Sequence, residues 1–399
     1  MNAKPVDAAT IRAWWWTRQG LDRSLVGAAP EAVLQRSGWA RSVGGVSPYL
    51  TLFSRAGITR TVADEAVAAA DIHELPAARG CTYVVPSEDY ALSLRVAAAA
   101  GDPEVKTALK LGVTEEELER VCEAVLGALS KNAKDPEDLR AELGGIVRSL
   151  GEAGKKKGVT TTIPVALGML QLRGEIRRVP SNGRFDQQRY RYALWRPNPL
   201  KGLRLTDEEA FTRLAEKYLR WIGPVTLEEV CWFTGMGKRV GASILRSLGA
   251  VPIAEGDPRV MLPADLDALR SHEPSGEPAF ALVGSIDAMT AHRRDAKALL
   301  DEADRAHPLL TEGAAFADLT SHAILDRGRL VGLWEFDPAE SVIVAATFDR
   351  KLLRHPQLRE AIAHTERFVR DELGDARAFS LDSPKSRAPR LAALRAAAG

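Results

Sequence analysis

The stretch that decides the fold runs from residue 155 to residue 204 and has the sequence KKKGVTTTIPVALGMLQLRGEIRRVPSNGRFDQQRYRYALWRPNPLKGLR. It contains twelve lysines and arginines but only two acids, Glu175 and Asp186, so it carries a net charge of +10. The whole chain of 399 residues has a net charge of only +1. Positive charge concentrated in this way attracts phosphates, by electrostatic steering and by release of counterions from a nucleic acid.

The order of segments within this stretch predicts a helix followed by a β-hairpin. An apolar, helix-like run covers Thr161–Arg173, and two β-rich runs follow at Glu175–Pro180 and Arg189–Trp195. Between the two β-runs, Asn182-Gly183 supplies the positive φ values that a tight turn needs. A helix followed by such a hairpin is typical of the helix and wing of a winged helix, a DNA-binding module.

The regions on either side repeat this pattern of short helices followed by a strand or strand pair. Asp7, Thr114 and an acidic turn from Asp207 mark helix starts. At 399 residues the chain is too long for one core. It divides into five predicted parts: a first winged-helix unit, 1–113; a second unit with the basic wing, 114–204; a third unit, 205–272; a C-terminal β-rich domain, 273–382; and a basic tail, 383–399, either flexible or helical from Arg390.

The C-terminal domain is predicted from alternating apolar and polar residues after a linker at Pro274–Pro278. The predicted strands are Ala279–Gly284, Ala315–Leu325, Leu330–Phe336 and Ser341–Phe348, with a helix near Gln357–Leu373 after them. The expected fold class is therefore α+β: three tandem winged-helix units followed by an antiparallel β-sheet or small barrel.

Composition excludes several other classes of protein. No stretch of about 18 apolar residues predicts a membrane span. The three cysteines and seven histidines lack the spacing of a zinc site or a disulfide framework. We expect a cytoplasmic, nucleoid-associated monomer that uses no metal or cofactor and whose partner is double-stranded DNA.

The candidate phosphate contacts are the basic side chains at the start of the stretch and on its hairpin, and we expect the hairpin arginines to project together from one concave side. These candidates are Lys155, Lys156, Lys157, Arg177, Arg178, Arg184, Arg189 and Arg191. The alternative interpretation is a solvated basic face with no ligand.

Several short motifs occur in an order that resembles the YcaQ and AlkZ family of bacterial DNA glycosylases. They are Arg18-Gln19-Gly20-Leu21, Ser47-Pro48-Tyr49-Leu50-Thr51-Leu52-Phe53-Ser54-Arg55, Tyr83-Val84-Val85-Pro86-Ser87-Glu88-Asp89, Ser285-Ile286-Asp287 followed by Arg293-Arg294, and Asp326-Arg327-Gly328-Arg329-Leu330-Val331-Gly332. The resemblance spans nearly the whole chain. It implies tandem winged helices curled around DNA, and hydrolysis of the N-glycosidic bond of alkylated or crosslinked bases.

The chain departs from this family at the catalytic motif. The family places a glutamine, an apolar residue and an aspartate or glutamine just before the Ser-Pro-Tyr-Leu run, where they position the attacking water. Here the corresponding positions hold Ser37, Gly38 and Trp39, and shifts of a few residues do not restore the pair. The catalytic residues are therefore unknown, and the sequence leaves open whether the protein is an enzyme.

Three functions remain as alternatives. The first is a DNA-binding protein of repair that lacks the family's catalytic pair, with Gln35, Trp39, Arg41 and Tyr49 as candidate base or cleft contacts. For Trp39, packing in the core is the competing interpretation. The second is an active glycosylase in which Gln35, Glu88 or Asp89 positions water. The third is a transcriptional regulator, since winged helices serve that role widely.

Overall fold

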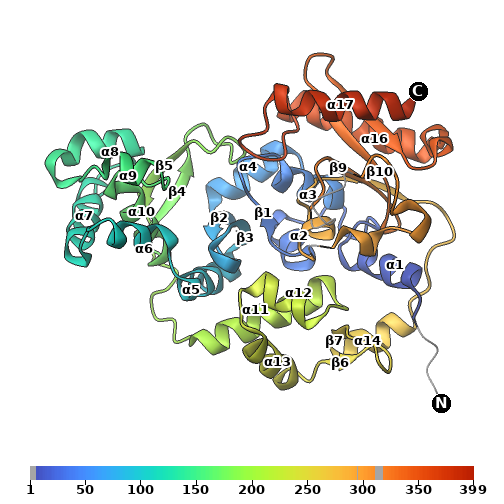
Figure 1. Cartoon of the computed structure of the whole chain (residues 1–399), viewed down its shortest axis with the longest axis horizontal. Coiled ribbons are helices and arrows are strands. Elements are labelled where there is room, and N and C mark those ends of the chain that lie inside the picture. The colour runs from blue at the N-terminus through green and yellow to red at the C-terminus, as the bar shows by residue number, and fades with distance from the viewer. Residues whose placement is uncertain (1–5, 294, 311–317) are drawn as a thin grey trace.

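The computed structural model describes residues 6–293, 295–310 and 318–399, and it has the predicted α+β class (Figure 1). Helices dominate the N-terminal two thirds, and an antiparallel sheet lies near the C-terminus. In Figure 1 the elements from α6 to β5 form a lobe at one side, with α11–α14 below and the C-terminal elements at the opposite side.

The first region combines five helices with a small antiparallel sheet in the strand order β1-β3-β2. Its elements are α1 (Ala8–Arg18), α2 (Pro30–Ser37), β1 (Ala40–Arg41), α3 (Ser47–Ala56), α4 (Arg60–Ala69), β2 (Ile72–Pro76), β3 (Thr82–Pro86) and α5 (Tyr90–Ala100). As predicted, Asp7 caps α1 by accepting a hydrogen bond from the backbone N–H of Thr10. Strands β1 and β2 were not predicted, because the first is very short and the second carries the polar pair His73-Glu74.

The second region contains the basic stretch. Its elements are α6 (Pro103–Lys110), α7 (Glu115–Ala128), α8 (Pro136–Leu143), α9 (Gly151–Lys155), α10 (Thr162–Leu172), β4 (Ile176–Pro180) and β5 (Tyr190–Leu194). The predicted helix and hairpin are confirmed within one or two residues at each end. Apolar residues of α7, α8 and α10 form a core of their own, which Ile176 and Tyr192 of the hairpin join.

The third region consists of four helices and one short strand pair. Its elements are α11 (Asp207–Ile222), α12 (Leu227–Thr234), α13 (Lys238–Ser247), β6 (Val251–Pro252), β7 (Val260–Met261) and α14 (Pro263–Arg270). Thr206 and Thr226 begin α11 and α12 with reciprocal side-chain caps to Glu209 and Glu229. These caps explain why both helices start where the sequence predicts.

The C-terminal region is an open four-stranded antiparallel sheet in the order β11-β10-β9-β8, so the barrel alternative is wrong. Its elements are β8 (Phe280–Val283), α15 (Ala288–Ala291), β9 (His322–Asp326), β10 (Arg329–Asp337), β11 (Val342–Thr347), α16 (Pro356–Phe368) and α17 (Pro384–Ala398). Part of the predicted strand Ala315–Leu325 lies outside the described residues.

The basic tail is helical rather than flexible. Helix α17 begins at Pro384, earlier than predicted, and packs against β10 and β11. Its arginines pair with acids of the same region, such as Arg395 with Asp337 at 2.6 Å. The tail is therefore an integral part of the C-terminal region.

Candidate nucleic-acid interface

The strand register separates the hairpin arginines into two faces. Arg177 pairs with Ala193, and Val179 pairs with Arg191, so Arg177 and Arg191 lie on the same face in diagonal positions. The next pair outward joins Ser181 to Arg189, which places Arg189 on that face as well. Arg189 and Arg191 are exposed and Arg177 is half-buried. We name these three side chains the arginine face, because the strand register places them on one side of the hairpin.

Arg178 points to the opposite face of the hairpin. Its guanidinium lies 5.2 Å from the ring centroid of Tyr190. It also lines a cavity of about 420 Å³ between the first and second regions, together with Gln171 and Tyr192. Arg178 is directed into the molecule, because successive residues of a strand alternate between its two faces.

Arg184 is likewise turned inward. It forms an ion pair with Asp186 at 2.5 Å and donates a hydrogen bond to the carbonyl of Leu373 at 3.0 Å. The Asp186 hydrogen bond is the main factor that raises the pKa of Arg184. The expectation that all hairpin arginines project together is therefore wrong for Arg178 and Arg184.

The hairpin tip, residues 181–189, docks on the first region. Phe185 is fully buried, and its ring stacks on Tyr49 of α3 with a centroid distance of 4.2 Å. The Tyr49 hydroxyl donates a hydrogen bond to Asp64 of α4. Figure 1 shows the loop between β4 and β5 crossing towards α4. Tyr49 therefore anchors the tip in this conformation and is not available as a cleft contact.

The three lysines lie at the end of α9 and directly after it, outside the strands of the hairpin. Lys155 ends α9, and all three lysine side chains are exposed to solvent. Lys155 forms one weak ion pair with Glu152, at 3.8 Å and with both side chains mostly exposed. The lysines remain candidate phosphate contacts on a second site of the same region.

Trp39 belongs to the core. It is 0% exposed, and its indole N–H donates a hydrogen bond to Asp89 at 2.8 Å. Asp89 also pairs with Lys217 at 3.0 Å. Burial raises the pKa of Asp89, and Lys217 opposes this shift. Of the two alternatives for Trp39, the structure therefore supports packing in the core. The carboxylate of Asp89 is occupied by its contacts with Trp39 and Lys217.

Gln35 and Arg41 occupy different environments. Gln35 is exposed on α2, and its backbone carbonyl accepts a hydrogen bond from the indole of Trp221. Arg41 is half-buried on β1, where it donates to the carbonyl of Thr82 at 2.9 Å and lies over the ring of Tyr83. The candidates Gln35 and Arg41 are therefore not brought together with Trp39 and Tyr49 in one cleft.

Sequence reasoning missed a buried carboxylate that lies beside Ser42, three residues after the position of the family motif. Glu74 on β2 is only 5% exposed, and Ser42, which follows β1, donates a hydrogen bond to it. Burial raises the pKa of Glu74, while the hydroxyls of Ser42 and Tyr190 favour its charged form. The only sequence signal was the polar pair His73-Glu74 between Ile72 and Leu75, and the pairing of β1, β3 and β2 brings Glu74 to this place.

A buried ion pair joins two of the short motifs across the chain. Arg55 forms two hydrogen bonds of 2.8 Å with Asp287, and both side chains are 0% exposed. Gln19 accepts a third hydrogen bond from Arg55 and donates to the carbonyls of Ser37 and Trp221. Although burial opposes its charge, Arg55 keeps the pKa of Asp287 below the ordinary value. These residues hold the first, third and C-terminal regions together.

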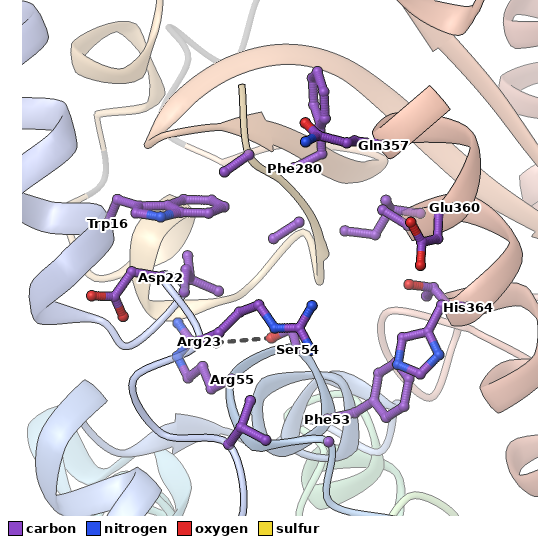
Figure 2. Close-up of a pocket in the computed structure, with 18 of the residues that line it drawn as sticks. Trp16, Asp22, Arg23, Phe53, Ser54, Arg55, Phe280, Gln357, Glu360 and His364 are labelled. Carbon is purple, nitrogen blue, oxygen red and sulfur yellow. Dashed lines mark hydrogen bonds between the residues drawn. The ribbon is translucent and has the colours of Figure 1, made fainter. Parts of the chain in front are cut away.

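The larger of the two pockets described here lies away from the hairpin (Figure 2). Its volume is about 510 Å³, and its lining comes from the segment after α1, from α3, β8 and α16. The apolar surface of the pocket comes from Trp16, Phe53 and Phe280. Its charged residues include the acids Asp22 and Glu360 and the basic Arg23. None of the hairpin residues contributes to it, so this pocket is separate from the arginine face.

Comparison with known proteins identifies the family of the chain. The family described as "DNA glycosylase AlkZ-like" matches residues 43–379. The chain belongs to the AlkZ-like DNA glycosylase family. Among solved structures, the Streptomyces sahachiroi DNA glycosylase AlkZ is similar with a TM-score of 0.70 and 20% sequence identity, over 95% of this chain and 99% of that chain. No curated protein sequence matches the chain.

The family match begins directly after the divergent segment. It starts at residue 43, so Trp39 and Arg41 lie outside it, while Tyr49, Arg55 and Asp287 lie inside. The shared part of the chain thus includes the buried ion pair and the hairpin.

The described residues contain neither a candidate metal site nor a membrane-spanning helix. Across 6–293, 295–310 and 318–399, no three His, Cys, Asp or Glu side chains are grouped so that they could hold a metal ion. None of the helices in this part of the chain is long and apolar enough to cross a membrane.

Proposed function

We propose that the protein binds double-stranded DNA through the arginine face of the β4–β5 hairpin, Arg177, Arg189 and Arg191, and acts in the recognition or repair of alkylated or crosslinked DNA. The observation that carries this proposal is the placement of three arginines on one side of a wing-like hairpin in a member of the AlkZ-like DNA glycosylase family. Among the described residues, none of the three arginines forms an ion pair with an acid; Arg191 donates a hydrogen bond to the neutral carbonyl of Ala133 at 3.0 Å. Their positive charge therefore remains available for phosphates.

The scaffold of this proposal is three tandem winged-helix units. Each helical region is followed by antiparallel strands: β2 with β3, β4 with β5, and β6 with β7. In such modules a wing contacts the DNA backbone while a helix approaches a groove. We propose that the second unit supplies the main electrostatic contact, since it carries the concentrated charge.

The experiment compares the dependence of DNA affinity on salt in two variants. Replacement of Arg177, Arg189 and Arg191 by alanine should weaken binding to duplexes of any sequence. It should also lower the slope of log K against log salt by about 2.7, because each lost phosphate contact contributes about 0.9. The matched control replaces three exposed arginines of the C-terminal region, Arg350, Arg354 and Arg359. An unchanged slope in the hairpin variant would refute the proposal.

A second candidate function, excision of a damaged base, is favoured by Glu74. A carboxylate next to the motif position could orient water for attack on the sugar. Incubation of the protein in excess with DNA containing N7-alkylated purines should then produce abasic sites, and Glu74→Gln should abolish them without loss of DNA affinity. Absence of abasic sites with the unmodified protein would leave DNA binding as the function.

A further inference from the structure

An exposed apolar turn lies between the π-helical end of α16 and the start of α17. Leu381 is 84% exposed and Phe379 is 41% exposed. The backbone N–H of Asp382 donates to the carbonyl of Phe379 at 3.0 Å, which closes the turn. Leu381 is more exposed than any other large apolar side chain in the described residues. Two apolar side chains exposed on one turn are a candidate contact for a ligand.

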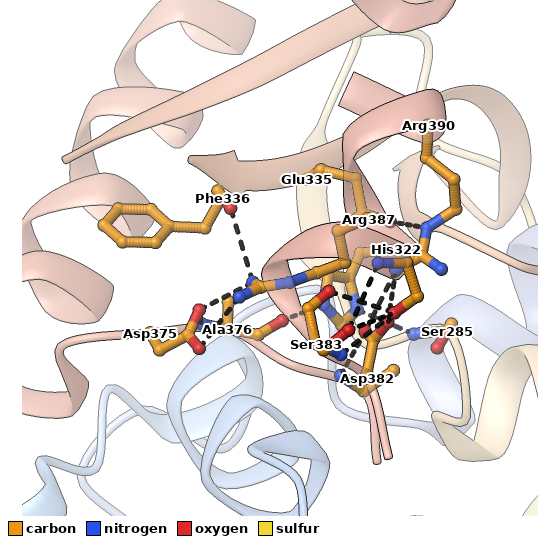
Figure 3. Close-up of polar contacts among 12 residues, drawn as sticks. Ser285, His322, Glu335, Phe336, Asp375, Ala376, Asp382, Ser383, Arg387 and Arg390 are labelled. Carbon is orange, nitrogen blue, oxygen red and sulfur yellow. Dashed lines mark hydrogen bonds and ion pairs between the residues drawn. The ribbon is translucent and has the colours of Figure 1, made fainter. Parts of the chain in front are cut away.

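The turn is held rigidly at both ends (Figure 3). On the C-terminal side of the turn, the carboxylate of Asp382 accepts two hydrogen bonds of 2.9 Å from Arg390. On the N-terminal side of the turn, Asp375 forms an ion pair with the buried Arg387 at 2.6 Å, and the carbonyl oxygen of Ala376 lies 2.7 Å from a ring nitrogen of His322. The two apolar side chains are therefore presented from a fixed backbone, which reduces the entropy lost when a ligand binds.

The turn adjoins the segment 42–46 and the hairpin tip. The backbone N–H of Ser380 donates to the carbonyl of Val43 at 3.0 Å. Gly45 lies so close to the Ala378 backbone that a Cβ atom would come within 2.3 Å of its carbonyl oxygen. On the other side of this segment, Gly44 abuts the side chain of Gln188, the neighbour of Arg189. The segment 42–46 is thus flanked by the apolar turn and by Gln188 of the hairpin tip, next to Arg189 in the chain.

A second link ties the turn to the hairpin. Arg377 donates a hydrogen bond to the carbonyl of Asp186 at 3.1 Å, and Arg184 donates to Leu373. The apolar turn therefore borders the tip of the hairpin whose strands carry the arginine face, and a surface that covers both combines apolar and basic side chains. A ligand that spans this surface must offer negative charge to the arginines and an apolar face to the turn.

We propose that Phe379 and Leu381 form a wedge that contacts the bases of duplex DNA while the arginine face holds its phosphates. Duplex DNA combines the two chemistries, because its backbone is anionic and its base faces are apolar once a step is opened. Side chains such as leucine and phenylalanine insert between base steps in other DNA-binding proteins and partly unstack them. The inference rests on the proposed DNA binding and adds the element that would deform the duplex.

The test uses the full chain and a duplex that carries 2-aminopurine, whose fluorescence rises when the base is unstacked. The unmodified protein should increase this fluorescence. The double variant Phe379→Ser and Leu381→Ser should abolish the increase and weaken binding about tenfold, since it removes two apolar contacts. Its salt slope should stay unchanged, because no phosphate contact is lost. The matched control is Val26→Ser, which alters an apolar side chain that is 60% exposed at the rim of the 510 Å³ pocket.

The outcomes separate this inference from the proposed function. If the unmodified protein binds DNA without any fluorescence change, or if the double variant binds and unstacks as well as the control, the wedge is refuted while DNA binding stands. If the double variant instead abolishes self-association seen by sedimentation, the turn is an interface between two copies, and the wedge is again refuted. If the unmodified protein does not bind DNA, both proposals fail together.

Discussion

Replacement of Asp287 by asparagine is the most direct test of how the regions are held together. The change keeps the shape of the side chain but leaves the guanidinium of Arg55 without a counter-charge. Both side chains are 0% exposed, and the two hydrogen bonds between them measure 2.8 Å. An unpaired buried charge costs about 3–5 kcal/mol. The other groups that accept hydrogen bonds from Arg55 are the side chains of Gln19 and Ser54 and the carbonyl of Thr51; all are neutral and do not supply a counter-charge.

Urea unfolding followed by tryptophan fluorescence measures this loss. The control is Glu302→Gln, because Glu302 pairs with Arg305 at the surface, where the side chains are 84% and 45% exposed. An exposed pair contributes at most about 1 kcal/mol, so the control should change stability little. The apolar double variant Arg55→Met and Asp287→Leu should recover most of the loss, since it removes both charges.

The reasoning would be refuted if Asp287→Asn lowered the free energy of unfolding no more than Glu302→Gln does. Such a result would mean that Arg55 finds water or another partner when Asp287 is neutralised. A loss of the expected size is a large part of the stability of a domain, which is about 5–15 kcal/mol. The variant should therefore also unfold at a visibly lower temperature.

Two further predictions concern the hairpin tip and the buried histidines. Phe185→Ala removes a fully buried ring from its stack on Tyr49. If the tip unfolds together with the core, this variant should lower the free energy of unfolding by about 3–5 kcal/mol. If the tip opens locally, the variant should increase amide hydrogen exchange at the tip alone. Amide protection identical to that of the unmodified protein would contradict the docking of the tip. Burial lowers the pKa of both His73 and His292 from 6.5 to about 3. The unfolded chain then binds more protons between these values, so stability should fall as the pH drops below 6.5, by up to about 1.4 kcal/mol per pH unit for each histidine. Measurement of the unfolding free energy as a function of pH checks this prediction. The variant His73→Phe should remove the part of the pH dependence that His73 contributes.

Local features were predictable because their causes are local. Helix α1 starts at its Asp7 cap, as the residue types require. The predicted strands of the β4–β5 hairpin are also confirmed, but residues 181–189 join them as a loop centred on Phe185, so the predicted tight turn at Asn182-Gly183 is wrong. The resemblance to the AlkZ-like family was also visible, since its motifs are short and ordered. The three-unit division and the phosphate contacts remain predictions.

The orientation of side chains was not predictable from the same residues. Arg178 and Arg184 belong to the same basic run as Arg177, yet one lines an internal cavity and the other pairs with Asp186. The difference arises from the alternation of the strand and from the docking of the tip. Neither effect is visible in net charge, which counts a buried arginine and an exposed one alike.

The sequence by itself determined the α+β class, the helix starts, the hairpin and its charge, because capping, periodicity and turn chemistry act over a few residues. Only the tertiary structure decided which arginines face solvent, that Trp39 is a core residue and that Glu74 lies beside Ser42. It also decided that Arg55 meets Asp287, 232 residues further along the chain. The physical reason is that burial and charge pairing depend on which segments pack together, and those contacts form between residues far apart in the chain.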